Sequence, residues 1–300
     1  MKKILLFGKT GQVGWELQRA LVPLGSVIAV DTHSTEICGD FSDPQGVAET
    51  VRLIRPDIVV NAAAYTAVDK AESEYKLAHL INAASVEAIA RETEALNAWL
   101  VHYSTDYVFP GTGDSPWDEN DRPAPLNVYG ETKLAGEKSI QQECSKYLIF
   151  RTSWVYAAKG NNFVKAMLRL ARERHEISVV NDQFGAPTGA ELLADCTAHA
   201  ISIAMNKTDV TGLYHLVATG TTNWFEFAQL IFAEARKAGL TLAVQKVNAI
   251  KSDSYPTPAK RPLNSRLNTS KITQKFGLTL PHWENGVKRM LAEVSTWSSV

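Results

Sequence analysis

Cysteine is scarce in this sequence. The three residues of this type, Cys38, Cys144 and Cys196, are odd in number, lie far apart and show no CxxC spacing. This pattern argues against a disulfide framework and against a cysteine-rich zinc site, and it favours a reducing compartment. We therefore expect a cytoplasmic protein.

An excess of either charge is also missing. Lys and Arg number 31 against 32 Asp and Glu, so no general basic field exists that would hold nucleic acid or an anionic membrane. Nowhere do about 18 apolar residues run together, which is the length that a membrane-spanning helix needs. The first apolar run ends at Gly8, too early for a signal peptide. We expect a soluble protein with no nucleic-acid or membrane partner.

Metal-ligand patterns are absent as well. The seven histidines include no HExxH pair, and the carboxylates are scattered along the chain. The spacing of these residues therefore indicates no metal site, and the metal ligands stay unknown.

What the sequence does contain is an alternation of short β-branched runs and longer helical patterns. The candidate strands are residues 4–7, 26–30, 57–60, 99–103 and 147–150. Strands separated by helices predict an α/β fold, here a Rossmann-like, doubly wound parallel sheet with right-handed crossovers. The regularity weakens after Trp154. We expect an NAD(P)-binding Rossmann domain over 1–154 and a second, smaller α/β substrate lobe over 155–300, with some segments returning to the first domain.

A glycine-rich loop joins the first candidate strand to a helical pattern. The amides of such a loop and the following helix N-terminus can hold a pyrophosphate, although a plain turn is the alternative. The predicted cofactor-binding residues of the loop are Gly8, Gly11, Gln12, Val13 and Gly14.

The second candidate strand leads into Asp31, about 20 residues after Gly11, where a ribose-binding carboxylate is expected. Its charge favours NADH over NADPH, but Lys9 and His33 lie close enough in sequence to offset that preference. Both NADH and NADPH therefore remain candidates for the cofactor. Further along, Asp40 and Phe41 are candidates for the adenine edge, with a simple Asx turn as the alternative.

Two side chains with acid–base chemistry lie one helical turn apart. Tyr129 and Lys133 have a four-residue separation that puts both on one helix face, and a nearby cation is expected to lower the pKa of the phenol. Thr105, at the end of the fourth candidate strand, is placed to bind the reacting oxygen. Thr105, Tyr129 and Lys133 are therefore the predicted catalytic residues, with Tyr129 and Lys133 also contacting the cofactor.

Together, these motifs resemble the extended short-chain dehydrogenase/reductase family. Within it, the sequence is most similar to the branch that reduces 4-keto sugars carried on dTDP. The similar segments are FGKTGQVG at 7–14, STDYVF at 104–109, VYG at 128–130, RTSWVY at 151–156, DQFGAPT at 182–188 and RPLNS at 261–265.

The resemblance implies reduction of dTDP-4-dehydro-L-rhamnose to dTDP-L-rhamnose, a precursor of surface polysaccharide such as O-antigen. It places further residues along the cofactor, namely Ala64, Tyr65, Thr66 and Tyr103. Ala63 is a further candidate, because the small side chains after the third candidate strand let a cofactor approach the backbone closely, with a buried packing position as the alternative. Some relatives are Mg²⁺-dependent dimers, so the resemblance also implies a homodimer and a possible Mg²⁺ requirement.

The remaining site predictions concern the sugar nucleotide. Asp106 is followed by Tyr107 where dehydrating relatives have Glu, so dehydration lacks its base and simple reduction remains. Trp154 is expected to stack on the deoxyhexose, with a core position as the alternative. Arg261 and Asn264 lie in the densest basic cluster of the second half and are candidates for the substrate diphosphate, with a solvated charged surface as the alternative.

Two other functions fit parts of this pattern. A nucleotide-sugar epimerase uses the same three catalytic groups but keeps its cofactor redox-neutral overall. A dinucleotide-binding regulatory subunit uses the fold without turnover. The joint presence of Thr105, Tyr129 and Lys133 favours an enzyme.

Overall fold

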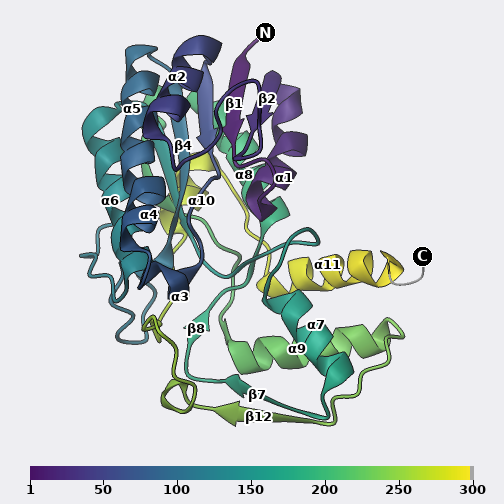
Figure 1. Ribbon diagram of the computed structural model, residues 1–300. Helices are drawn as coiled ribbons and strands as arrows, with labels where there is room; N and C mark the ends of the chain where they lie inside the picture. The colour runs from purple at the N-terminus through teal and green to yellow at the C-terminus, as the bar shows by residue number, and fades with distance from the viewer. Residues whose placement is uncertain (298–300) are drawn as a thin grey trace.

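A six-stranded parallel sheet forms the centre of the larger part of the molecule (Figure 1). The computed structural model describes residues 1–297, with side chains as far as residue 294. The strands lie in the order β10-β5-β4-β3-β1-β2. Their bounds are β1 Lys3–Phe7, β2 Ser26–Val30, β3 Ile58–Asn61, β4 Trp99–Thr105, β5 Tyr147–Thr152 and β10 Gly212–His215. The first five match the predicted strands, so the Rossmann-like prediction is confirmed.

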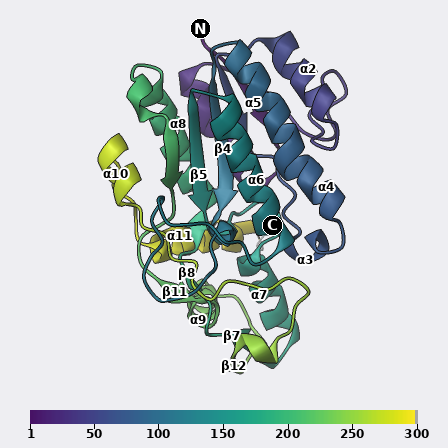
Figure 2. The ribbon, with the colours of Figure 1, turned by 90° about the vertical axis from the view of Figure 1, so that its left-hand side faces the viewer.

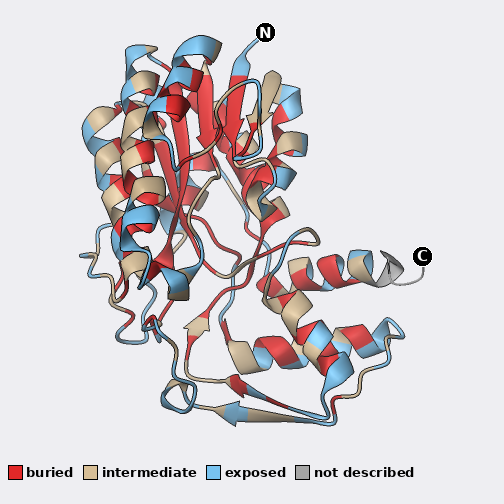
Figure 3. Ribbon diagram, in the orientation of Figure 1, coloured by how far each residue is buried: buried red, intermediate tan, exposed pale blue. Residues whose placement is uncertain are grey.

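Helices cover both faces of this sheet, as the view turned by 90° also shows (Figure 2). On one face lie α1 (Gln12–Leu21) and α8 (Ala190–Ala204), and on the other α2 (Pro44–Ile54), α5 (Ser85–Ala95) and α6 (Val128–Glu143). The strands β1, β3, β4 and β5 are almost wholly buried, because they lie between two helical layers, whereas the edge strand β2 is only partly buried over residues 26–29 (Figure 3). Continuous apolar strands are what such a double cover requires.

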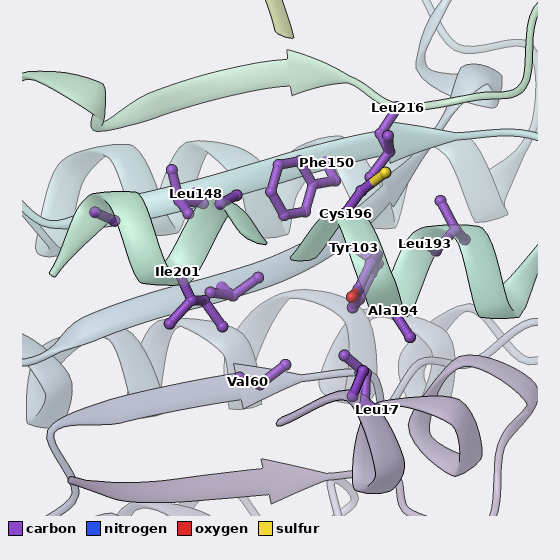
Figure 4. Close-up of a cluster of buried hydrophobic side chains, with 14 of the residues drawn as sticks. Leu17, Val60, Tyr103, Leu148, Phe150, Leu193, Ala194, Cys196, Ile201 and Leu216 are labelled. Atoms are coloured by element: carbon purple, nitrogen blue, oxygen red, sulfur yellow. The ribbon is translucent and has the colours of Figure 1, made fainter. Parts of the chain in front are cut away.

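The alternating side chains of β4 illustrate how the sheet divides two cores. Val101 and Tyr103 face α8, in the cluster that Figure 4 shows with Leu193 and Ile201 of that helix. Leu100 lies in the other core, with α5 and α6. Alternate side chains of β4 therefore face helices on opposite sides of the sheet.

Short helical elements connect the strands and the main helices. They are η1 (Val22–Leu24), α3 (Val68–Ala71), α4 (Tyr75–His79), the π-helical η2 (Leu80–Ala84), η3 (Asp106–Val108), η4 (Thr208–Val210), η5 (Ser252–Ser254) and α10 (Ser270–Phe276). The π turn runs directly into α5 and places Asn82, a buried amide that bears on the site below.

A smaller part lies beyond the carboxyl ends of the sheet strands (Figure 1). It contains α7 (Phe163–Glu173), α9 (Trp224–Lys237) and α11 (Trp283–Trp297), with β7 (Glu176–Val180) paired in parallel to β12 (Lys246–Ile250). Two-residue strands complete it, namely β6 (Val155–Tyr156), β8 (Phe184–Gly185), β9 (Thr188–Gly189) and β11 (Thr222–Asn223). Because β10 belongs to the large sheet and α8 covers one of its faces, the chain after residue 154 contributes to both parts.

Two expectations about absent features can be compared with the structure. All three cysteines are free. Among residues 1–297, no helix has the length and apolar character needed to cross a membrane.

Candidate active site

The glycine loop has the geometry of a phosphate cradle. Gly8 has φ +84°, a left-handed conformation, and a Cβ there would lie 2.7 Å from the amide nitrogen of Ala63. A Cβ at Gly14 would overlap the carbonyl of Gly8, so the helix start packs directly on the loop. The N-terminus of α1 has no side-chain cap and no acidic residue in its first turn. Its free amides and positive dipole end therefore fit the pyrophosphate of a dinucleotide.

Asp31 lies at the carboxyl end of β2, where its buried carboxylate has hydrogen-bond donors and a cation nearby. Its Oδ1 accepts hydrogen bonds from the His33 amide at 3.0 Å and from the Ser34 hydroxyl at 3.3 Å, and it lies 4.0 Å from Lys9 Nζ. Burial acts to raise the pKa of Asp31, but the hydrogen bonds from His33 and Thr10 and the Lys9 charge outweigh it and leave the pKa below its usual value. The carboxylate is therefore ionised at neutral pH, with a cation at hand.

The two adenine candidates occupy different environments. Asp40 accepts a hydrogen bond from the Ser42 amide at 2.8 Å, which is the Asx turn given above as the alternative. Phe41 is buried, with its ring edge-on to Phe7 at 5.2 Å between centroids. The Phe41 side chain thus belongs to the core, so the prediction of an adenine contact is restricted to the backbone of this residue.

The segment after β3 is held against α6 by one buried amide. Asn82 accepts from the Tyr65 amide at 2.9 Å and donates to the Tyr65 carbonyl and to the Thr132 hydroxyl, both at 3.1 Å. This fixes Ala63, Ala64 and Tyr65 beside the glycine loop. The Tyr65 hydroxyl donates to Glu74, and Thr66 is exposed.

Tyr129 is placed by a helix cap. Asn127 caps α6, accepting from the Gly130 amide at 2.9 Å and donating to the Lys260 carbonyl at 2.8 Å, so it also ties α6 to a distant loop. This puts Tyr129 in the first turn of α6, next to the end of β4. The Thr105 hydroxyl there accepts from the Tyr107 amide at 3.2 Å, donates to Asp106 Oδ1 at 3.2 Å, and lies close enough to Tyr129 to affect the pKa of the phenol.

The predicted lowering of the Tyr129 pKa is wrong. Burial raises the pKa of Tyr129 to about 12, and the hydrogen bond with Thr105 opposes this only in part. The Lys133 amine does not reach the phenol, since it donates to the Tyr103 carbonyl at 2.6 Å and lies 3.1 Å from His102 Nε2. A raised pKa keeps the phenol protonated at neutral pH, which is the form a reductase needs as proton donor.

Lys133 is a buried amine in a polar layer behind the phenol. The residue is 1 % exposed, and burial lowers its pKa to about 8, although the Glu137 charge acts in the opposite direction. An amine with a pKa this close to neutrality can change its protonation state during a reaction.

Tyr103 contributes its backbone to the site. The ring lies in the core against α8, where its hydroxyl bonds Thr197 at 2.6 Å. The prediction that Tyr103 lines the cofactor is therefore corrected to its carbonyl, which accepts from Lys133.

Asp106 is a buried carboxyl with one free oxygen. Its Oδ1 accepts from Thr105 at 3.2 Å, Oδ2 has no hydrogen-bond partner, and burial raises the pKa of Asp106 to about 7. A buried carboxyl oxygen without a hydrogen-bond partner, next to Thr105, fits a contact with a polar substrate group.

Trp154 has φ +50°, an uncommon conformation for a bulky residue, and its ring stacks on Trp224 at 3.7 Å. The Trp224 indole in turn donates to Gln183 at 3.1 Å. One face of Trp154 is therefore taken by Trp224. Gly185 lies against the Trp154 ring, because a Cβ there would come within 2.9 Å of it.

Two substrate-binding candidates are engaged within the protein. Arg261 makes a two-point ion pair with Asp69, at 2.9 and 2.8 Å. Asn264 is buried, donates to the carbonyls of Thr112 and Ser115, and accepts from Arg266. These contacts favour a role in holding loops together, because they leave little hydrogen-bonding capacity for a diphosphate.

Three buried polar residues beside the candidate site were not named from the sequence. His102 contacts Lys133, while Arg151 and Glu137 form a buried ion pair that joins β5 to α6, with N–O distances of 2.9 and 2.6 Å. Glu137 lies four residues after Lys133, a spacing that signals a shared helix face. No comparable signal marked His102 inside an otherwise apolar strand.

The donor set does not fit a protein-held metal. Within residues 1–297, no three His, Cys, Asp or Glu side chains come together as a possible metal site. No step of the chemistry below is therefore assigned to Mg²⁺.

Comparisons with known proteins cover nearly the whole chain. Residues 1–296 match the family model described as RmlD substrate binding domain. The chain is 71 % identical over 297 residues to the dTDP-4-dehydrorhamnose reductase of Escherichia coli K12 and 69 % identical over 297 residues to that of Salmonella typhimurium, covering 99 % of each protein and of this chain. It also superposes with a TM-score of 0.87 on a dTDP-4-dehydrorhamnose reductase from Bacillus anthracis in complex with NADP, with 37 % identity, 97 % of this chain and 99 % of the other.

Proposed function

The chain belongs to the family of dTDP-4-dehydrorhamnose reductases, and from this premise we propose how its side chains reduce the 4-keto group of dTDP-4-dehydro-L-rhamnose to give dTDP-L-rhamnose. The observation that supports the assignment is that Thr105, Tyr129 and Lys133 all lie around the carboxyl end of β4, at the same edge of the sheet as the glycine loop after β1. Ligands of open α/β sheets bind outside this edge.

Each residue has a defined task in the reaction. Thr105 hydrogen-bonds the keto oxygen, and Tyr129 delivers its proton to that oxygen as the carbon becomes tetrahedral. When bound, the reduced nicotinamide supplies the hydride that C4 receives. Lys133 stabilises the phenolate that remains on Tyr129 after proton transfer, because its positive charge favours the ionised phenol.

The cofactor is NADH or NADPH, held by the glycine loop and by Asp31. The NADP complex of the Bacillus anthracis relative supports NADPH, and the Lys9 amine 4.0 Å from Asp31 offers a partner for a 2′-phosphate. Around the cofactor the proposal places Gly8, Gly11, Gln12, Val13, Gly14, Asp40, Phe41 through its backbone, Ala63, Ala64, Tyr65 and Thr66.

Replacing Asp31 by alanine is expected to weaken NADH binding more than NADPH binding. The carboxylate accepts hydrogen bonds from a ribose 2′-hydroxyl but repels a 2′-phosphate, so its removal costs NADH a contact and relieves NADPH of a repulsion. Dissociation constants for both cofactors, measured by fluorescence titration, test this. Equal losses would show that Asp31 is not the ribose contact.

The rate of reduction is expected to fall as pH rises through about 8. Both Tyr129 and Lys133 act protonated in reduction, and Lys133, with a pKa of about 8, loses its proton first. The pH profile of kcat/KM should therefore be level below this pH and fall about tenfold per unit above it. An Asp106→Asn variant is the control. If kcat/KM still falls above pH 8 in this variant, the titration of Asp106 is not the cause of the fall.

On the substrate side, Asp106 and Trp154 contact the sugar nucleotide directly. Arg261 and Asn264 hold the surrounding loops together. Residues 1–154 mainly bind the cofactor and 155–300 mainly the sugar nucleotide. A cytoplasmic homodimer that supplies a surface-polysaccharide precursor completes the proposal, supported by the family. Sedimentation analysis tests the dimer.

A panel of 4-keto nucleotide sugars tests the activity. Loss of NAD(P)H absorbance with formation of dTDP-L-rhamnose supports reduction. A redox-neutral conversion would select the epimerase alternative, and cofactor binding without any turnover would select a regulatory subunit.

A further inference from the structure

A line of buried polar groups runs through the protein from the segment after β3 to the catalytic lysine. The Ala63 amide donates to Asn61 Oδ1 at 2.9 Å, and Asn61 Nδ2 lies 3.1 Å from His102 Nδ1. On the other side of the ring, His102 Nε2 lies 3.1 Å from Lys133 Nζ. Asn61 and His102 are both 0 % exposed, so no solvent competes for these contacts.

The donors and acceptors in this line of polar groups determine which group donates in each hydrogen bond. Since the Ala63 N–H can only donate, it requires the oxygen of the Asn61 amide, and the Asn61 NH₂ then points at His102. His102 Nδ1 must accept from that NH₂ and carries no proton. A neutral imidazole has one N–H, which therefore sits on Nε2 and points at the Lys133 amine.

This direction bears on the charge of Lys133. A neutral amine accepts a hydrogen bond from His102 Nε2–H and can still donate to the Tyr103 carbonyl. An ammonium has only donors, so it would set an N–H against the Nε2–H of His102. The ammonium form therefore requires either a broken contact or reversal of the whole line, including loss of the bond between Ala63 and Asn61.

Resting on the proposed reductase function, we propose that His102, oriented by Asn61, is a positioning residue that holds the Lys133 amine in place and sets its protonation equilibrium during reduction. The groups facing Lys133 are few. From its own helix, Glu137 favours the charged form. From β4 come the neutral His102 and the Tyr103 carbonyl. Behind these groups lie the neutral Asn61 of β3, which contacts His102, and Arg151 of β5, whose charge is paired with Glu137. Burial and the Lys133 charge hold the pKa of His102 well below its usual range, so the ring itself stays neutral.

The first test uses the unaltered protein. Nitrogen NMR of protein with ¹⁵N-labelled histidine, with the His102 signals assigned by their loss in His102→Gln, reports which ring nitrogen carries the proton. At pH 9, where the lysine is mainly uncharged, we expect the Nε2–H tautomer. The Nδ1–H tautomer would overturn the proposal.

The second test compares two substitutions that alter the hydrogen-bonding groups between the Ala63 amide and Lys133. In Asn61→Asp, a carboxylate accepts from both the Ala63 amide and Nδ1–H of His102, which turns Nε2 into an acceptor for the ammonium. In His102→Gln, the amide oxygen can accept from the ammonium directly. Both variants are expected to move the basic limb of the kcat/KM profile upward by about one pH unit or more.

A matched control is His199→Gln, since that ring bonds the Phe276 carbonyl far from the site and its loss should leave the limb in place. A limb that stays at the wild-type pH in both site variants would overturn the proposal. Failure of wild-type protein to reduce the keto sugar would instead count against the proposed function, because the tautomer is measured without substrate.

Discussion

Replacing Tyr129 by phenylalanine is expected to lower turnover by about 10²–10⁴-fold, the contribution of a positioned proton donor. The ring packs edge-on to Tyr107 at 5.7 Å between centroids, and phenylalanine keeps that contact. NADPH affinity should therefore be largely retained, because the glycine loop and Asp31 are unchanged. Steady-state kinetics and a cofactor titration measure the two effects separately.

Tyr107→Phe serves as the matched control, since it removes a neighbouring hydroxyl without touching the catalytic phenol. Most of the turnover should survive in this variant. If Tyr129→Phe kept near wild-type turnover, or if both variants lost it equally, the assignment of Tyr129 as proton donor would be wrong.

Replacing Arg151 by methionine is expected to destabilise the fold by about 3–5 kcal/mol, because it leaves the Glu137 carboxylate buried without its partner. The pair is nearly inaccessible, with side-chain exposures of 3 % and 1 %, and two hydrogen bonds join it. It clamps α6, the helix that carries Tyr129 and Lys133, to β5. Denaturant unfolding measures the loss.

The double variant Arg151→Met/Glu137→Leu is expected to recover most of that stability, since no charge is then left unpaired. Arg91→Met, which removes an exposed partner of Glu143, should change the free energy of unfolding little. A single variant as stable as the double variant would contradict the account of a buried, mutually dependent pair.

Local patterns were enough to predict five of the six strands of the sheet and to name candidates for the main site. The glycine loop, the acidic residue after β2 and the Tyr129–Lys133 spacing each follow from rules that act within a few residues, and the strands that carry them were found for the same reason. β10 was not among the predicted strands, because its four residues join the sheet only through pairing with β5, far away in sequence.

Contacts distant in sequence also account for the errors. The spacing placed Lys133 next to Tyr129, but not against His102 and the Tyr103 carbonyl, which come from a strand about thirty residues earlier. Arg261 looked available for a phosphate because Asp69, its partner, lies 192 positions away. The burial that raises the Tyr129 pKa is likewise a property of the assembled fold.

The most direct measurement of the central claim uses NADPH deuterated at the transferable position of the nicotinamide. Incubated with dTDP-4-dehydro-L-rhamnose, the protein should yield dTDP-L-rhamnose with one deuterium at C4 for each NADPH oxidised. Product without deuterium at C4, or conversion without oxidation of NADPH, would contradict direct reduction at the site built from Thr105, Tyr129 and Lys133.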